Sequence, residues 1–241
     1  LIQPANQPRA TSTGSRNSGE TSWQFGHESV REAAAALLPV SIRQELHLQI
    51  GKVLWHQLNP DQRQLLLPII VDHQNQAHRL LQTSGDRRRL AELNLGAARE
   101  AKRFGANAAY FRFASAGLRL LPEDAWETAY ELTLGLHEEQ LEAAYLCANF
   151  ENVEYTFRTI LERARKKLDQ VTAFQVRIRA SASANRPAEA IDLGLKILAE
   201  LGIALPPDPK RRDVVRALLA SRIALLGRKP EDLLELPRMT D

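Results

Sequence analysis

The chain has 241 residues, of which 44% are hydrophobic and 25% are charged, a composition typical of a folded soluble protein rather than a disordered one. Lysine and arginine number 32 against 29 aspartate and glutamate. The resulting net charge of +3 is too small to indicate a nucleic-acid-binding protein. The single cysteine, Cys147, excludes an internal disulfide framework and any multi-cysteine metal site. No apolar run is long enough to span a membrane, and with a lone thiol and no export signal we expect a cytoplasmic protein. Because the chain opens on Leu1 and its only methionine is Met239, we expect an internal piece of a longer protein.

The N-terminal region is predicted to be a linker followed by a strand and a helix. Residues 1–22 are crowded with Pro, Ser, Thr, Gly and Asn and offer almost nothing to bury, so we expect a loop or linker there. Residues 23–25, Trp-Gln-Phe, alternate apolar and polar side chains, which is typical of a short β-strand. Residues 27–38 then have the apolar spacing of a helix that Pro39 should end.

The rest of the chain is predicted to be helical, because apolar residues recur at spacings of three and four between Pro and Gly punctuation. We expect Ser41 to cap the first of these helices, Pro68 to bend or break the second, and Gly85 with Asp86 to form a turn. The stretch 125–147 has two apolar faces, which is typical of a helix packed between neighbours. The predicted helices span residues 41–58, 59–82, 90–104, 106–121, 125–147, 151–164, 169–184, 187–201 and 211–226.

Three of these helices share one packing pattern. Ala109, Phe113 and Ala116 fall at spacings of four and three, as do a small, an aromatic and a small residue in the second helix of tetratricopeptide repeats (TPRs). Small residues there let helices approach closely, and the aromatic ring fills the gap. The starts of the three patterns are 44 and 37 residues apart, against about 34 in a strict repeat, so we predict irregular helical hairpins stacked in series. The equivalent residues are Val153, Phe157 and Ile160, and then Ala190, Gly194 and Ile197.

No catalytic or metal site is predicted within this segment. The chain lacks the P-loop sequence G-x-x-x-x-G-K-[ST] and the nucleophile motif G-x-S-x-G. His73 and His78 are five residues apart, which does not direct two imidazoles toward one metal ion, so we expect no metal and no cofactor here. His137 is expected to be a hydrogen-bonded histidine of the core or its rim, and Cys147 a buried small side chain.

Residues 210–229 are predicted to contain a basic amphipathic helix. Seven lysines and arginines face a single acid, Asp213, and an apolar stripe runs along the other side. Such a helix can lie on an anionic membrane or dock a partner. We favour the alternative that its stripe packs on a neighbouring helix while its basic face stays in water. The stripe consists of Val214, Val215, Leu218, Leu219 and Ile223.

Six strings, taken in order, resemble one family. The first, WQFGHESVREAAAALLP over residues 23–39, resembles the segment that closes the nucleotide-binding module of signal-transduction ATPases with numerous domains (STAND), a branch of the AAA-like P-loop ATPases. The others are similar to the region between that module and the GAF domain in large bacterial sensor proteins. They read RQELHLQIGKVL, RRLAELNLGAAREAK, LLPEDAWETAYELTLGLHEEQLEAAYLCANFE, AEAIDLGLKILAELGIALP and PEDLLELPRMTD.

The resemblance implies a parent protein that binds ATP with Mg²⁺ upstream and carries serine/threonine or histidine kinase domains, so that the parent is an ATP-dependent kinase. In related ATPases a histidine near the end of the winged-helix region contacts the nucleotide phosphate, which implies a nucleotide-sensing role for His27; a structural histidine at a helix start is the alternative. We expect a linker at 1–22, the winged-helix-like tail of the ATPase module at 23–84, and TPR-like repeats, cut at their end, at 85–241.

We therefore predict an all-α fold, a TPR-like helical-hairpin solenoid with a small winged-helix remnant and a short strand at its N-terminal end. The predicted function is a non-catalytic regulatory segment that couples the ATP-binding module to kinase output. Its expected partners are the intramolecular ATPase and kinase domains, or other proteins held on the concave repeat face; we expect no nucleic-acid partner and no membrane span. A stand-alone adaptor for protein partners and the helical-repeat part of a STAND transcription activator are the alternatives.

Overall fold

The computed structural model describes residues 2–4, 23–25 and 27–224, and these residues are mostly helical. They fall into two compact units, Leu1–Thr156 and Phe157–Asp241, which are described separately below. The prediction that the chain is mainly helical is confirmed for the described residues. The predicted domain boundary between residues 84 and 85 lies inside the first unit and stays a prediction.

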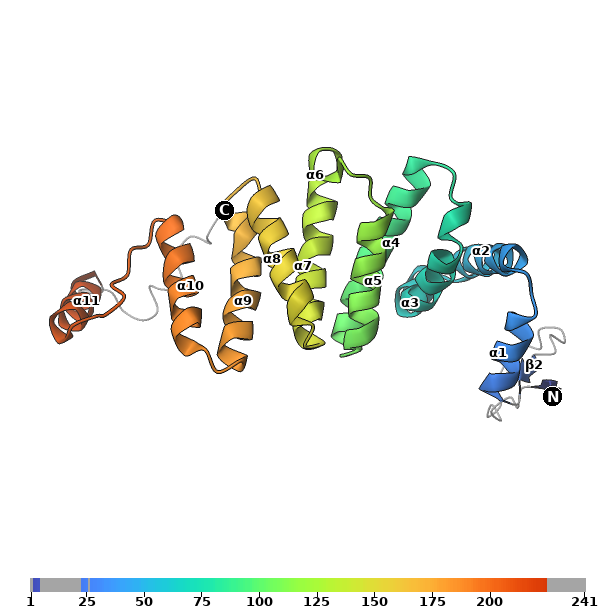
Figure 1. Cartoon of the computed structure of the whole chain (residues 1–241), viewed down its shortest axis with the longest axis horizontal. Helices are drawn as coiled ribbons and strands as arrows, with labels where there is room; N and C mark the ends of the chain where they lie inside the picture. Colours follow the sequence, from blue (N-terminus) through green and yellow to red (C-terminus); the bar gives the residue numbers. More distant parts are fainter. Residues whose placement is uncertain (1, 5–22, 26, 225–241) are drawn as a thin grey trace. The chain divides into compact units, whose positions relative to one another are not determined.

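The N-terminal end of the first unit is a two-stranded antiparallel ribbon followed by a short helix. Strand β1 (Ile2–Pro4) pairs with β2 (Trp23–Phe25), with Ile2 opposite Phe25, and helix α1 (Glu28–Ala36) follows (Figure 1). The strand predicted at residues 23–25 is confirmed. The loop predicted over 1–22 is wrong at residues 2–4, because the backbone of that stretch pairs with a strand whose residues lie 19 to 23 positions further along the chain. The remaining linker residues lie outside the described part of the chain.

Helix α2 (Val40–Gln57) packs against α3 (Pro60–Gln76). The N-cap predicted at Ser41 is wrong: α2 begins one residue earlier, after Pro39, and has no side-chain cap. The next helix has the cap instead, since the Asn59 side chain accepts a hydrogen bond from the Gln62 amide (2.9 Å) and the Gln62 side chain accepts one from the Asn59 amide (3.1 Å). The break predicted at Pro68 does not occur, because α3 continues through it while packed between α2 and α4.

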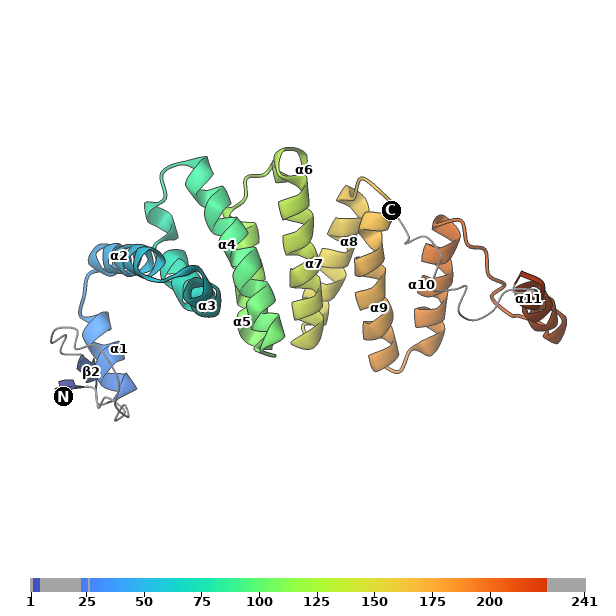
Figure 2. The same cartoon turned by 180° about the vertical axis from the view of Figure 1, so that it is seen from behind.

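Helix α4 (Ser84–Arg103) packs on α3, on α5 (Asn107–Leu120) and on α7 (Tyr130–Leu146), and α5 also packs on α7. Figure 2 shows α4 and α7 side by side. The turn predicted at Gly85–Asp86 is wrong, because the Thr83 hydroxyl accepts a hydrogen bond from the Asp86 amide (3.0 Å) and so starts the helix earlier. The helix predicted over 125–147 is two helices, α6 (Ala125–Thr128) and α7, separated by Ala129 at φ −143° and ψ 47°.

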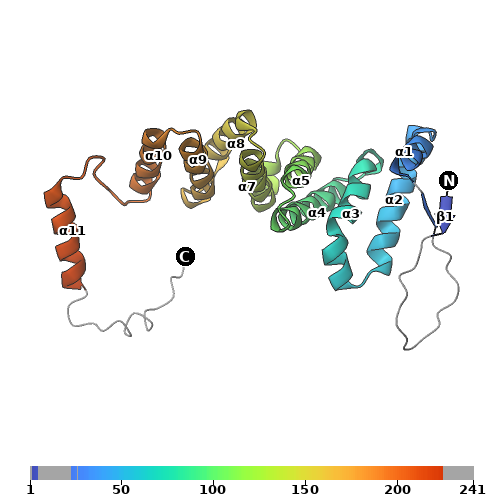
Figure 3. The ribbon, with the colours of Figure 1, turned by 90° about the horizontal axis from the view of Figure 1, so that it is seen from below.

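Helix α8 (Phe150–Arg163) contains the boundary between the two units. In the second unit, the 3₁₀ turn η2 (Leu168–Gln170) leads into α9 (Val171–Ser183), and α9 packs on α10 (Pro187–Glu200). Figure 3 shows α9 and α10 side by side. The phenyl rings of Phe157 and Phe174 meet edge to face at 5.3 Å within this unit.

Helix α11 (Arg211–Ala224) confirms the predicted basic helix as far as residue 224; its last two predicted residues lie outside the described chain. The expectation that its stripe packs on a neighbour is wrong for the described residues, since the five apolar side chains of the stripe are 48–68% exposed. Among the residues that the structure describes, no helix combines the length and the apolar content needed to cross a bilayer.

One hairpin turn recurs three times. Gly105, Ala148 and Asn185 have left-handed φ angles of 67°, 54° and 57°, and a new helix begins two residues after each of them. At each turn the amide that follows this residue donates to a carbonyl five residues earlier, which closes the end of the preceding helix. The distances are 2.9 Å for Ala106 to Ala101, 2.8 Å for Asn149 to Ala144 and 2.9 Å for Arg186 to Ser181. The turns are 43 and 37 residues apart, so α4–α5, α7–α8 and α9–α10 are hairpins of one local design.

The core of the first unit lies where α3, α4, α5 and α7 meet. Asn94, which is fully buried, exchanges two hydrogen bonds of 2.8 Å with Asn75 and ties α4 to α3. A methyl group added at Gly117 would lie 2.6 Å from Leu136 Cδ2, so α5 and α7 approach closely there. The apolar residues of the main cluster are Leu67, Val71, Leu90, Ala97, Ala98, Ala101, Tyr110, Phe113, Ala114 and Ala143.

The turn geometry predicts opposite effects of two substitutions. Ala148→Gly should raise the free energy of unfolding by about 1 kcal/mol, because a left-handed conformation strains any residue with a Cβ atom. Gly105→Ala should lower it by a similar amount, since its added methyl would meet nothing within 4 Å and only the backbone would be strained. Urea unfolding followed by circular dichroism measures both, and destabilisation by Ala148→Gly would contradict the recurring turn.

Candidate functional site

His27, the residue proposed to sense nucleotide, lies exposed just before α1. Its carbonyl oxygen accepts a hydrogen bond from the Val30 amide at 3.2 Å, as at an ordinary helix start. The chain has no P-loop sequence, so it does not itself contain the Gly-rich loop and lysine that cradle the phosphates of ATP in P-loop proteins. The nucleotide-sensing role of His27 stays a prediction.

The residues predicted to pack the repeats lie mainly inside. Phe113, Ala116, Val153, Phe157, Ile160 and Ile197 are buried, and Ala109, Ala190 and Gly194 are half-buried. The close approach of helices expected at Gly194 is absent. A methyl group added there would contact only Ile178 Cδ1, at an ordinary van der Waals distance of 3.8 Å. Cys147 is exposed at the end of α7, so the prediction of a buried small side chain is wrong for it.

A histidine pair joins α2 to α3. The Nδ1 atoms of His47 and His73 lie 2.7 Å apart, and the two rings are tilted with centroids 5.0 Å apart. No signal in the sequence predicts this pair, because the residues are 26 positions apart and meet only through helix packing. Within the described part of the chain, no group of three or more His, Cys, Asp or Glu side chains could hold a metal ion.

A cavity of about 270 Å³ opens between α2 and α4 in the first unit. Its walls are mainly apolar, and three basic side chains and one carboxylate stand around them. It suits an apolar side chain of a binding partner that carries a negative charge nearby, since the two cations Lys52 and Arg89 outnumber Asp86. The lining residues are Leu48, Lys52, Trp55, His56, Gln74, Leu81, Asp86, Arg89, Leu90 and Leu93.

Trp55 is the aromatic side chain in the lining of this cavity. The guanidinium carbon of Arg89 lies 5.7 Å from the centroid of its ring and that of Arg63 lies 5.4 Å away, so two cations are placed over the indole. The Arg63 Nε atom is buried and has no hydrogen-bond partner among the described residues. The indole thus holds two arginines beside an apolar wall.

Three consecutive arginines at the start of α4 lie in three different surroundings. Arg87 lines a separate cavity with Arg79 and Arg119. Arg88 pairs with Glu92 at 3.3 Å on the exposed side of the helix. Arg89 lies over Trp55. Successive residues turn by about 100° around a helix, which separates these neighbours in sequence.

The other conspicuous charges hold helices together. The Glu139 carboxylate on α7 accepts hydrogen bonds from Arg99 Nε of α4 (2.8 Å) and from the Tyr110 hydroxyl of α5 (2.5 Å). Lys102 of α4 pairs with Glu142 of α7 at 2.7 Å. Burial and the hydrogen bond to Glu139 raise the pKa of Tyr110 far above its usual value, so the phenol stays a proton donor. These groups brace α4, α5 and α7 and form no nucleophile–base pair.

His137 is a second titratable group whose pKa is shifted by burial. Its ring stacks on Trp126 with centroids 5.0 Å apart and planes 12° apart. Burial lowers the pKa of His137 to about 4, because the charged imidazolium loses its hydration. The prediction of a hydrogen-bonded histidine at this position is wrong for Nδ1. This atom is buried and has no hydrogen-bond partner in the described part of the chain.

Comparison of the chain with protein-family models, with curated proteins and with solved structures finds no match. The function proposed below therefore rests on the sequence strings, the hairpins and the surfaces described above.

The neutral imidazole of His137 predicts a loss of stability in acid. Above pH 6.5 the ring is neutral in both the folded and the unfolded chain, so it contributes no pH dependence. As the pH falls from 6.5 to 4, only the unfolded chain takes up the proton, and the free energy of unfolding should fall by about 3 kcal/mol at most. His137→Phe keeps the stacking on Trp126 and should remove this part of the pH dependence in urea unfolding. An equal decline in the variant, or an imidazole titrating near 6.5 by NMR, would contradict the buried neutral ring.

Proposed function

We propose that this chain is a non-catalytic, TPR-like regulatory segment of a bacterial signal-transduction ATPase and sensor kinase, where it couples the ATP-binding module to kinase output. In the parent, ATP with Mg²⁺ is bound upstream of this segment, and phosphoryl transfer takes place in the kinase domains. The segment contributes packing surfaces and a binding cavity. Its partners are the neighbouring domains of the same cytoplasmic protein, or other proteins.

The recurring hairpin turn carries this proposal. Three hairpins with the same left-handed residue, the same five-residue backbone bond and the same two-residue step into the next helix are what tandem helical repeats require. Their spacings of 43 and 37 residues follow the spacings of the small–aromatic–small pattern in the sequence. Repeats of this kind stack nearest neighbour on nearest neighbour, so a change at one end can reach the other.

Two further features support an interaction role. Helix α2 keeps a stripe of four apolar side chains 40–47% exposed, and an upstream module would find an apolar surface there to cover. The stripe consists of Ile42, Leu46, Ile50 and Val53. The cavity around Trp55 lies on α2 and α4, the first helices of their hairpins, and first helices line the concave face of a TPR-like stack.

A matched pair of charge reversals in the full-length protein tests this function. Arg89→Glu places a carboxylate in the Trp55 cavity, whereas Arg88→Glu makes the same change one residue away on the exposed side of α4. We expect Arg89→Glu to change ATP-dependent autophosphorylation, or its response to the upstream module, by about tenfold, since it removes a cation over an aromatic ring and adds repulsion. Arg88→Glu should leave both within about twofold of the wild type.

Deletion of residues 86–205 from the same protein completes the test. Loss of regulation with the kinase domains still folded supports the coupling role. Kinase output and regulation that are both unchanged would overturn it. A parent without any ATPase or kinase activity, in which the chain still binds a protein through the Trp55 cavity, would favour the stand-alone adaptor instead.

A further inference from the structure

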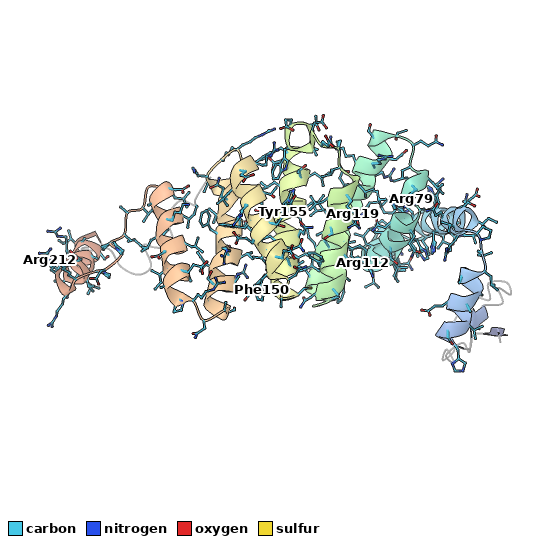
Figure 4. All side chains as sticks on the ribbon, in the orientation of Figure 1. Arg79, Arg112, Arg119, Phe150, Tyr155 and Arg212 are labelled. Carbon is cyan, nitrogen blue, oxygen red and sulfur yellow. The ribbon has the colours of Figure 1, made fainter. Side chains whose placement is uncertain are left out.

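A second cavity, separate from the one around Trp55, lies where η1 (His78–Leu80), the start of α4 and the end of α5 meet. It has a volume of about 290 Å³. Arg79, Arg87 and Arg119 reach it from three different elements, and His78 and Leu120 complete the lining. Figure 4 labels Arg79 and Arg119 on the ribbon. Side chains from three elements converge here on one positively charged hollow.

The three guanidinium groups have no carboxylate partner in the part of the chain that the structure describes. In residues 27–224 none of them has an ion pair, whereas Arg88, Arg99, Arg103, Arg112 and Arg177 all pair with carboxylates. The placement of Arg87 is also electrostatically unfavourable, because it lies in the first turn of α4, where the helix dipole disfavours a cation. Three unpaired positive charges around one hollow repel one another unless an anion joins them.

A phosphomonoester fits this arrangement best among anions. The planar guanidinium group of arginine binds two oxygens of a phosphate through two parallel hydrogen bonds, and clusters of arginines are the usual means of recognising a phosphorylated residue. A phosphoserine or phosphothreonine carries about −1.5 to −2 charges at neutral pH, which three arginines more than balance. The cavity also has room for the side chain that bears the phosphate.

The surface next to the cavity favours a peptide over a free nucleotide. A second hollow shares His78, Arg119 and Leu120 with it and adds Asn75 and Ala116. A third lies further along the same seam between α3 and α5, from Ala116 back toward Ala109, with the Asp72–Arg112 ion pair (3.3 Å) at its edge. The ten residue steps from Ala109 to Arg119 rise by roughly 15 Å along α5, the length of about five residues of extended peptide.

No Phe, Tyr or Trp side chain lines the arginine cavity or the hollow that shares its walls, so a nucleobase would find no aromatic ring to stack on. We propose that Arg79, Arg87 and Arg119 bind the phosphate of a phosphorylated serine or threonine in a protein segment that lies along the seam between α3 and α5. This site goes beyond the regulatory function proposed above, because that function requires no phosphate and uses other residues.

Fluorescence anisotropy with the 241-residue chain tests the site. The probes are a dye-labelled peptide of alanine and glycine with one central phosphoserine, the same peptide with serine, and AMP and inorganic phosphate as competitors. We expect at least tenfold tighter binding of the phosphorylated peptide than of its serine form. Arg87→Gln and Arg119→Gln should each weaken it by about tenfold to a hundredfold, the effect of losing a hydrogen bond to a charged group.

Arg88→Gln is the matched control, because it removes the same charge from the same turn of α4 but leaves the cavity intact. It should change the affinity by less than about threefold. Equal weakening by Arg87→Gln and Arg88→Gln would overturn the site, since it would mean nonspecific attraction. Equal binding of the serine peptide would also overturn it. If AMP displaced the labelled phosphopeptide with an affinity equal to that of the phosphopeptide itself, the site would be assigned to a nucleotide and the peptide assignment would be overturned.

Discussion

The packing of α4 against α3, α5 and α7 is the constraint on which the first unit depends. Alanines at positions 97, 98 and 101 are buried and let neighbouring helices approach, and Gly117 on α5 leaves room for Leu136. Only at such distances can the Asn75 and Asn94 amides join α3 to α4, and Glu139 join α7 to α4 and α5. Small side chains therefore fix the helix spacing, and the polar contacts then fix which helix faces which.

The same packing decides what the surface of α4 can do. Its buried stripe points inward, so the arginines at its start are spread around the remaining circumference. One lies over the Trp55 indole on the side of α2, one stays in water with Glu92, and one turns toward η1 and the end of α5. A short basic run is thus divided between two separate cavities, and the middle residue supplies an internal control for both.

Local signals in the sequence predict much of the fold. Contacts between residues that are far apart in the chain cannot be predicted in this way. Gly105 and Pro187 mark a helix end and a helix start because each has a backbone preference that needs no partner. The break at Ala129 has no such signal, and β1 depends on a strand 19 to 23 residues away. The arginine cavity was missed for the same reason: Arg79, Arg87 and Arg119 belong to no sequence motif and converge only when η1, α4 and α5 pack.

The proposed function requires the repeated hairpins to lie between an ATP-binding module and kinase domains, so the neighbouring sequence is its most direct test. The open reading frame should be read on both sides of residues 1–241. A G-x-x-x-x-G-K-[ST] sequence in frame upstream, with GAF and histidine-kinase motifs in frame downstream, is the predicted result. Stop codons close to both ends would contradict the coupling role and leave a solitary helical-repeat adaptor.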